Sequence, residues 1–420
     1  MTVDLVFGGV KPPPKPPKYI KKMFEDTMGE ESPWSDELQA AVEVLQVAAD
    51  MSRFVQSMLR PNGGALINPK IAVTEEQRQL VLEFLKLDLT PVTVADLAIQ
   101  AMVLTVLSNL FPQYGLVAEE TADLLRENAR ARALVTHLIV AHTRENEYVW
   151  AHGCSDFETN NDHLVQILDR AGYPNGDGNT KKSFWVMDPI DGTAAFVKHQ
   201  QYAINLGLIV DGIEVLGLVA CPQLDFELAK APGEPYSDIT GSPLESPGTL
   251  LYAVRGHGAW ALPLDMSLDP IRLPNLPECP SLSLSVSSIA VESGIHDTHK
   301  DVAMALGARH PHCDLQAWTL RWVSLALQHA NFTVWVYEDH NRCAKIWDHA
   351  GAMLLYTEVG GVITDILGRP IDLTKGRILS ANTGFAAASK RDHPILKAIV
   401  VKKLKDSYFQ KLLDIWRYES

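Results

Sequence analysis

The stretch Asp188-Pro189-Ile190-Asp191-Gly192-Thr193 follows directly on the apolar run from Ser183 to Met187. The apolar run has the composition of a strand, so the two carboxylates are expected where a chain leaves a sheet. They are three residues apart, and Pro189 limits the backbone between them, so they can face one hard cation or bridge two. Mg²⁺ takes oxygen ligands and keeps some waters, so a few carboxylates and a phosphate complete its shell. The stretch therefore indicates a magnesium and phosphate site.

Gly192 and Thr193 fit the phosphate part of this hypothesis. Gly192 lets backbone amides approach a phosphate closely, and the hydroxyl of Thr193 can orient a water molecule. The alternative is structural: an Asp-Pro turn followed by a surface Asp-Gly turn would account for the same residues. The apolar strand directly ahead of the motif favours the functional interpretation.

Three other carboxylates stand at the ends of expected elements, and each has an ordinary structural explanation. Glu119 follows the apolar stretch 114–117, although adjacent glutamates are usually solvated surface charge. Asp96 completes the pattern Thr93-x-x-Asp96, which is a helix capping box. Asp348 opens an expected helix, where the macrodipole favours an acidic residue whatever its function. Taken one by one, these residues leave both interpretations open.

Four separated segments, taken together, carry a family resemblance. They are 90–96, 117–120, 188–193 and 345–350, and the stretch 358–365 follows them. In this order they resemble the lithium-sensitive, magnesium-dependent phosphatase superfamily that includes inositol monophosphatase, fructose-1,6-bisphosphatase and 3′(2′),5′-bisphosphate nucleotidase. The sequence is most similar to the nucleotidase branch. The similarity covers roughly residues 36 to 400 and leaves the N-terminal segment unmatched.

The resemblance implies a set of site residues. The metal ligands would be Glu119, Asp188, the carbonyl of Ile190, Asp191 and Asp348. Asp96 would pair with Thr193 to activate the attacking water, and two or three Mg²⁺ ions would be bound. Such ions lower the pKa of a bound water, neutralise phosphate charge and stabilise the leaving alkoxide, so no covalent enzyme intermediate is required. The implied substrate is a small phosphate ester, first of all adenosine 3′,5′-bisphosphate, which would yield AMP and phosphate.

The sequence departs from the nucleotidase branch at several positions. Ala194-Ala195-Phe196 stands where the branch usually has Lys-Gly-Phe, and Gly351-Ala352 stands where it typically has Ala-Gly. The stretch 291–297 is shorter than the segment that helps to hold the nucleotide. Arg321 and Trp322 stand roughly where Lys and Tyr are expected; Arg321 can take a phosphate and Trp322 can stack on a base. A solvated arginine and a core tryptophan on one helix explain the same two residues equally well.

These departures keep other functions open. The same chemistry on an inositol phosphate or a phosphorylated specialised metabolite is one alternative. Another is a non-catalytic scaffold of the same fold, in which a Pro-rich tail would be the binding element. Retention of all the carboxylates speaks against the scaffold.

The pattern of apolar residues predicts a layered α/β fold. Helices are expected at 36–59 and 93–110, and strands at 202–210 and 213–221, joined by a type I′ turn at Asp211-Gly212. Mixed helices and antiparallel hairpins argue against a doubly wound sheet. The resemblance makes this an α+β sandwich of alternating α-β-α-β-α layers, with a mixed, largely antiparallel sheet and a second, smaller sheet.

The second half of the chain is less regular. The Pro-, Ser- and Gly-rich segment 225–280 is expected to be a surface connection. Beyond it the pattern predicts helices at 320–330 and 347–359, each followed by a strand, at 332–337 and 362–364. We expect three parts: a flexible tail over 1–34, a metal- and phosphate-binding domain over 35–250, and a C-terminal domain over 251–420 that contributes Asp348 and substrate contacts.

Composition excludes several classes of protein. The net charge of −14 opposes binding to a nucleic-acid polymer. No apolar run approaches the roughly 20 residues of a membrane span, and no signal core is visible, so a cytoplasmic or nuclear protein without membrane contact is expected. The five scattered cysteines suggest neither disulfides nor a zinc site. The segment Lys11 to Lys18 favours polyproline II, so a proline-binding module is a candidate partner for the tail.

Overall fold

The computed structural model describes residues 33–59, 94–160, 162–172, 182–230, 246–277, 294–308, 317–339 and 341–405. Several expectations fall outside these ranges. They concern almost all of the N-terminal tail, Thr93 of the proposed capping box, and residues 291–293 of the shortened stretch. Within the described ranges, none of the helices combines the length and the apolar character that a membrane crossing requires.

Seven strands form the larger sheet, and they neighbour one another in chain order. The strands are β1 (Gly115–Ala118), β2 (Phe184–Asp191), β3 (Ala203–Val210), β4 (Ile213–Cys221), β5 (Thr249–Val254), β6 (Gly258–Pro263) and β7 (Ile271–Arg272). β1 and β2 are parallel, and every other pair is antiparallel. The mixed, largely antiparallel sheet is confirmed.

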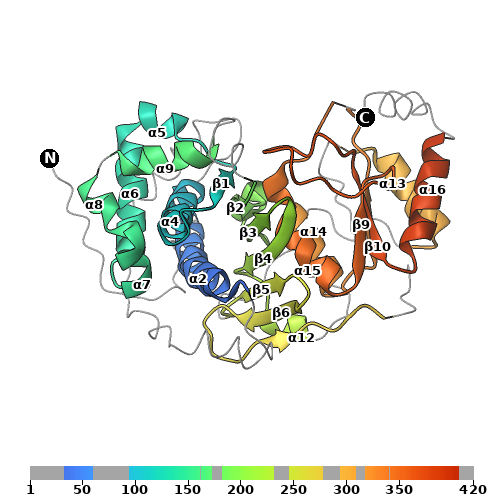
Figure 1. Ribbon diagram of the computed structural model, residues 1–420, viewed down its shortest axis with the longest axis horizontal. Helices are drawn as coiled ribbons and strands as arrows, with labels where there is room; N and C mark the ends of the chain where they lie inside the picture. Colours follow the sequence, from blue (N-terminus) through green and yellow to red (C-terminus); the bar gives the residue numbers. More distant parts are fainter. Residues whose placement is uncertain are drawn as a thin grey trace.

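Helices cover both faces of this sheet, and Figure 1 shows the resulting layers. α2 (Ser35–Met58) and α4 (Val94–Leu110) pack on one face, and α14 (Trp318–Ala326) and α15 (Ala352–Glu358) lie on the other. Because successive side chains of a strand point to opposite faces, Trp185 and Met187 of β2 join the core beneath α2 and α4. Phe184 and Val186 join the core beneath α14 and α15.

A smaller sheet lies beyond α15. It contains β8 (Phe332–Trp335), β10 (Phe385–Ser389) and β9 (Gly361–Thr364) in that spatial order, all antiparallel. α13 (His296–Ala305) and α16 (His393–Lys405) close its outer face through a third apolar cluster. The α-β-α-β-α order expected from the sequence is therefore confirmed.

The remaining described helices range from three residues to the 15 of α6, and α6, η1 and α9 pack against α4. They are α5 (Asp123–Glu127), α6 (Ala129–Thr143), α7 (Glu147–Val149), the π-helix η1 (Trp150–Cys154), α8 (Asp156–Thr159), α9 (His163–Gly172), α11 (Thr193–Val197) and α12 (Phe226–Lys230). Figure 1 places α6, α7 and α8 beyond α4 as seen from the sheet, whereas α9 also packs against β1.

The predicted hairpin is confirmed, since β3 and β4 pair with Val210 opposite Ile213. Asp211 and Gly212 have φ of +51° and +80°, and a type I′ turn requires positive φ at both positions.

Two predictions for the second half of the chain are wrong. The segment 225–280 is not only a surface connection, because it supplies β5, β6 and β7 of the larger sheet. The expected helix 347–359 is split into a 3₁₀ turn, η2 (Ile346–Asp348), and α15, since Gly351 between them has φ of +96°. The expected domain boundary at residues 250 and 251 falls inside β5, and the division stays a prediction.

Candidate active site

The carboxylates of the 188–193 motif lie inside the larger sheet. β2 continues through Asp191, so the motif forms the end of the strand and does not follow it. β2 lies between β1 and β3, and both aspartates are buried instead of facing solvent. The pairing of β2 with β3 is irregular between Asp188 and Asp191, and Oδ1 of Asp188 accepts a 3.0 Å hydrogen bond from the amide of Ile190. This bulge turns both carboxylates to one place.

Carboxylates from three other elements meet there. Burial, and then repulsion from Glu119, Asp191, Asp348 and Asp96, raise the pKa of Asp188 well above its usual range. The side chain of Glu119 also shares a hydrogen bond with Asp188. The structure thus brings together the end of β1, the end of β2, the first turn of α4 and the turn η2, which are far apart in the sequence.

Burial and mutual repulsion act on the other carboxylates as well. Burial and the charge of Asp191 raise the pKa of Glu119, and burial with the charges of Asp191 and Glu119 raises the pKa of Asp348 well above its usual range. For Asp191 burial raises the pKa, while hydrogen bonding to Thr319 and the charge of Arg321 oppose that rise. A cluster of this kind favours either proton uptake or cation binding.

Thr193 and Ile190 lie beside this cluster. The hydroxyl of Thr193, at the start of α11, donates a 3.1 Å hydrogen bond to the carbonyl of Ile190. Asp96 is buried in the first turn of α4 and interacts with Asp188. The pairing of Asp96 with Thr193 stays a prediction. Ala195 lies within α11, so the alanine that replaces the glycine of the nucleotidase branch stands in a helical turn, where it is favoured.

Asn205 holds the turn that carries Asp348 against the sheet. It lies directly opposite Asp188 on β3, and its amide donates hydrogen bonds of 2.6 and 2.9 Å to the carbonyls of Trp347 and Ala350. Sequence analysis missed this residue, because a single asparagine inside an apolar strand gives no signal for a partner 142 residues away.

Glycines allow the same turn to approach the sheet closely. A methyl group on Gly351 would lie 2.6 Å from the carbonyl oxygen of Leu206, and Gly207 and Gly217 face Gly351 from β3 and β4. The departure Gly351-Ala352 therefore places the glycine at the position that has positive φ and the closest backbone contact.

A cavity of about 570 Å³ opens beside Asp191 and Asp348. Its wall includes Gly192, Ala195, Trp318, Arg321, Tyr337, Arg342 and Lys345. The guanidinium of Arg321 lies 4.3 Å from the ring centroid of Trp318 and 4.6 Å from that of Trp335. A positive charge thus lies on the cavity wall, close to the carboxylates.

Trp322 lies in the core and not on the cavity wall, contrary to its expected role as a stacking partner for a base. Its side chain has 0% exposure, because it packs from α14 against Phe385 in the core. Its indole donates a 3.1 Å hydrogen bond to Nδ1 of His349. His349 is buried as well, and burial lowers its pKa well below the usual range. Trp318, one turn earlier, is the tryptophan that reaches the cavity.

The donor set fits a hard divalent cation. It contains the carboxylates of Glu119, Asp188, Asp191 and Asp348, whose mutual repulsion a cation would relieve, and no sulfur or imidazole ligand. Among the residues that the structure describes, no three His, Cys, Asp or Glu side chains already stand in a closed ligand arrangement.

Known proteins resemble this chain in sequence and in fold. The pattern that defines the inositol monophosphatase family matches residues 63–405. A 3′(2′),5′-bisphosphate nucleotidase of Schizosaccharomyces pombe is 32% identical over 335 residues, which are 77% of this chain and 88% of the relative. A 3′,5′-bisphosphate nucleotidase of Arabidopsis thaliana is 32% identical over 378 residues, 87% of this chain and 96% of the relative. The structure of a Thermotoga maritima IMPase shares the fold, with a TM-score of 0.50 and 15% identity over 88% of this chain and 99% of that one.

Proposed function

The chain belongs to the inositol monophosphatase family, and from this premise we propose that it is a phosphoric monoester hydrolase of the bisphosphate nucleotidase type. The preferred substrate is adenosine 3′,5′-bisphosphate, which is hydrolysed to AMP and phosphate. The observation that carries the proposal is the convergence of Asp96, Glu119, Asp191 and Asp348 on Asp188, beside a cavity that also exposes a cationic wall.

Mg²⁺ is the proposed cofactor, with two or three ions. Glu119, Asp188, Asp191, Asp348 and the carbonyl of Ile190 would hold it. Bound Mg²⁺ supplies a water of lowered pKa and neutralises phosphate charge. The carboxylates would hold the Mg²⁺ ions in position. The bulge in β2 keeps the side chains of Asp188 and Asp191 directed to the same point.

Asp96 and Thr193 are proposed to act on the attacking water. The water donates to the hydroxyl oxygen of Thr193, and Asp96 accepts the proton that the water loses as it attacks phosphorus. The bond between phosphorus and the ester oxygen breaks, and the leaving oxygen takes up a proton from solvent. Because water is the proposed nucleophile, no side chain is phosphorylated.

The cavity explains why a substrate with two phosphates suits this site. The wall of the cavity includes Arg321, beside Asp191. It also includes Arg342 and Lys345, which come after β8 in the sequence. Phosphate oxygens accept charge-assisted hydrogen bonds from such cations. One phosphate at the carboxylate cluster and a second at Arg342 and Lys345 would both lie within the cavity. Its volume falls within the range of sites for small molecules, about 300 to 1,000 Å³.

A phosphate-release screen with Mg²⁺ tests the proposal. The panel contains nucleoside 3′,5′-bisphosphates, nucleoside monophosphates, inositol phosphates, and sugar and prenyl phosphates. We expect the highest kcat/KM with adenosine 3′,5′-bisphosphate and no turnover in EDTA. A clear preference for an inositol phosphate or another metabolite would assign the same chemistry to that substrate, and inactivity on the whole panel would support the scaffold alternative. A cytoplasmic location is part of the proposal, and cell fractionation tests it.

A further inference from the structure

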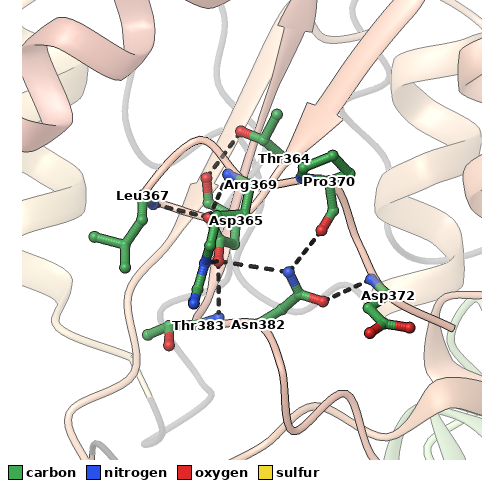
Figure 2. A network of polar contacts seen from close by, with 8 residues as sticks. All are labelled: Thr364, Asp365, Leu367, Arg369, Pro370, Asp372, Asn382 and Thr383. Atoms are coloured by element: carbon green, nitrogen blue, oxygen red, sulfur yellow. Dashed lines mark hydrogen bonds and ion pairs between the residues drawn. The ribbon is translucent and has the colours of Figure 1, made fainter. Parts of the chain in front are cut away.

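Arg377 lies in the connection between β9 and β10. A polar network of other residues, away from the candidate metal site, fixes the shape of this connection. Figure 2 shows the network around the buried carboxylate of Asp365. Its Oδ1 accepts hydrogen bonds of 3.0 and 2.9 Å from the amides of Leu367 and Arg369, and its Oδ2 accepts one of 2.7 Å from Nε of Arg369. Asn382 joins the two ends of the connection through the carbonyl of Pro370, at 2.8 Å, and the amide of Asp372, at 2.7 Å. These hydrogen bonds hold residues 365–372 against Asn382, so the connection can support the segments that pack on it.

The backbone around Arg377 pairs with the segment that leads to Asp348. The carbonyl of Arg377 accepts a 3.1 Å hydrogen bond from the amide of Ile346, and the amide of Leu379 donates one of 2.9 Å to the carbonyl of Ala344. An isolated antiparallel bridge joins Lys345 and Ile378 between these two bonds. The connection thus holds the residues directly ahead of η2.

The side chain of Arg377 reaches the other side of the site. One guanidinium nitrogen donates hydrogen bonds of 2.6 Å to the carbonyls of Ala118 and Ala171, and the other donates one of 3.2 Å to the carbonyl of Glu119. These carbonyls belong to the end of β1 and the last turn of α9. The guanidinium also lies 4.5 Å from the ring centroid of Trp347, the neighbour of Asp348.

We propose that Arg377 is a positioning residue that fixes the Glu119 end of β1 relative to the turn that carries Asp348, and so sets the affinity of the site for Mg²⁺. This inference rests on the proposed function. The two segments carry carboxylates that repel each other, so something must hold them at ligand distance. A planar guanidinium can bridge three carbonyls and stack on an indole at once, whereas the ammonium group of lysine cannot reproduce that geometry.

The test compares wild type, Arg377→Lys and Arg377→Ala with the matched control Lys375→Ala. Lys375 is an exposed cation in the same connection, and its ion pair with Asp372 lies away from the carboxylate cluster. Calorimetric titration with Mg²⁺ alone measures affinity without turnover. Residues that orient metal ligands typically change affinity about 10- to 100-fold when replaced. We expect both Arg377 variants to lose Mg²⁺ affinity in this range and to need a higher Mg²⁺ concentration for half-maximal activity. Their kcat at saturating Mg²⁺ should change less than their Mg²⁺ affinity does. Lys375→Ala should show wild-type values for all three quantities.

Amide hydrogen exchange of the metal-free proteins keeps the inference separate from the proposed function. We expect faster exchange at 115–120 and 344–350 in Arg377→Lys, and no change in Lys375→Ala. The positioning role would be overturned if the Arg377 variants showed unchanged exchange or a Mg²⁺ affinity equal to that of wild type. It would also be overturned if their loss of Mg²⁺ affinity were fully explained by a smaller fraction of folded protein. If wild-type protein bound no Mg²⁺, the proposed function would fail, and the exchange data would still decide the role of Arg377.

Discussion

The backbone amide of Thr319 donates a 2.6 Å hydrogen bond to Oδ2 of Asp191. This bond joins the start of α14 to the end of β2 across 128 residues. It orients a carboxylate that the family resemblance assigns to the metal, and it partly offsets the cost of burying that charge. The same bond makes Asp191 a suitable position for a mutational test, because it can survive the loss of the charge.

Replacement Asp191→Asn is expected to abolish nearly all Mg²⁺-dependent phosphate release while the fold is retained. The amide oxygen of asparagine can accept the Thr319 bond, but it lacks the charge that would attract a cation. The loss of several kcal/mol of transition-state stabilisation corresponds to a fall in kcat/KM of at least ~100-fold. Circular dichroism and thermal unfolding verify the fold.

Asp265→Asn is the matched control for this variant. Asp265 is exposed, and the hydrogen bond that its Oδ1 accepts from the amide of Ser267 is one that asparagine also makes. Its activity should equal that of wild type. Full activity in Asp191→Asn would contradict the metal-ligand assignment.

Lithium is expected to inhibit phosphate release at millimolar concentration or below. Li⁺ is a small, hard cation that oxygen ligands accept, but its single charge cannot neutralise a phosphate as Mg²⁺ does. Rates measured with LiCl, and with NaCl and KCl at the same ionic strength, test this. Indifference to lithium would argue against the nucleotidase branch.

The stability of the protein is expected to depend on pH through Glu214. This residue of β4 is buried, and its Oε1 accepts a 2.8 Å hydrogen bond from the amide of Gly351. Burial raises the pKa of Glu214 from 4.5 to about 7. Between these two values the folded protein holds a proton that the unfolded chain releases. The folded state therefore loses stability as the pH rises through this window, by about 3 kcal/mol in total, and no more above it.

Glu214→Gln removes this titration, because glutamine cannot ionise. Relative to wild type, the variant should gain up to about 3 kcal/mol of unfolding free energy between about pH 5 and about pH 8. Urea unfolding across this range measures the gain, and Glu145→Gln, which changes an exposed glutamate, is the control. A difference between variant and wild type that stays constant with pH would contradict the prediction.

Gly351→Ala is expected to be more destabilising than Gly360→Ala. The two glycines have φ of +96° and +98°, so alanine costs about 1 kcal/mol at either position through the backbone alone. Only at Gly351 does the methyl group meet another strand, at 2.6 Å from the carbonyl of Leu206, whereas nothing lies within 4 Å at Gly360. The overlap should add about 1–3 kcal/mol. Equal unfolding free energies for the two variants would refute the close contact.

The elements that sequence predicts well are those whose local pattern and tertiary surroundings agree. The helix expected at 36–59 is α2, and Asp211-Gly212 forms the expected turn, because apolar periodicity and turn chemistry act within a few residues. β10 escaped prediction, since its run of three alanines, Ala386 to Ala388, has helical propensity and becomes a strand only between β8 and β9. Likewise, turn residues elsewhere in 225–280 obscured the short strands β5 and β6.

The residues of the candidate site also fall into a predictable and an unpredictable group. The acidic residues were identifiable, because family motifs mark the ends of strands and helices where Glu119, Asp188 and Asp348 stand. Asn205 and Arg377 were not, since their partners lie 142 to 259 residues away and their own neighbours in sequence give no signal. The acidic positions of the cluster were therefore predictable, whereas those that hold them in place were not.

Gly207, Gly217 and Gly351 form a crossing point where one backbone rests on two strands with no side chains between them. Core side chains can be exchanged for others of similar volume, but a contact between bare backbones offers no such freedom. The crossing ties the location of Asp348 to the curvature of the sheet itself. A design that aims to change substrate choice can vary residues 341–345 of the cavity wall. The three glycines of the crossing have to be kept.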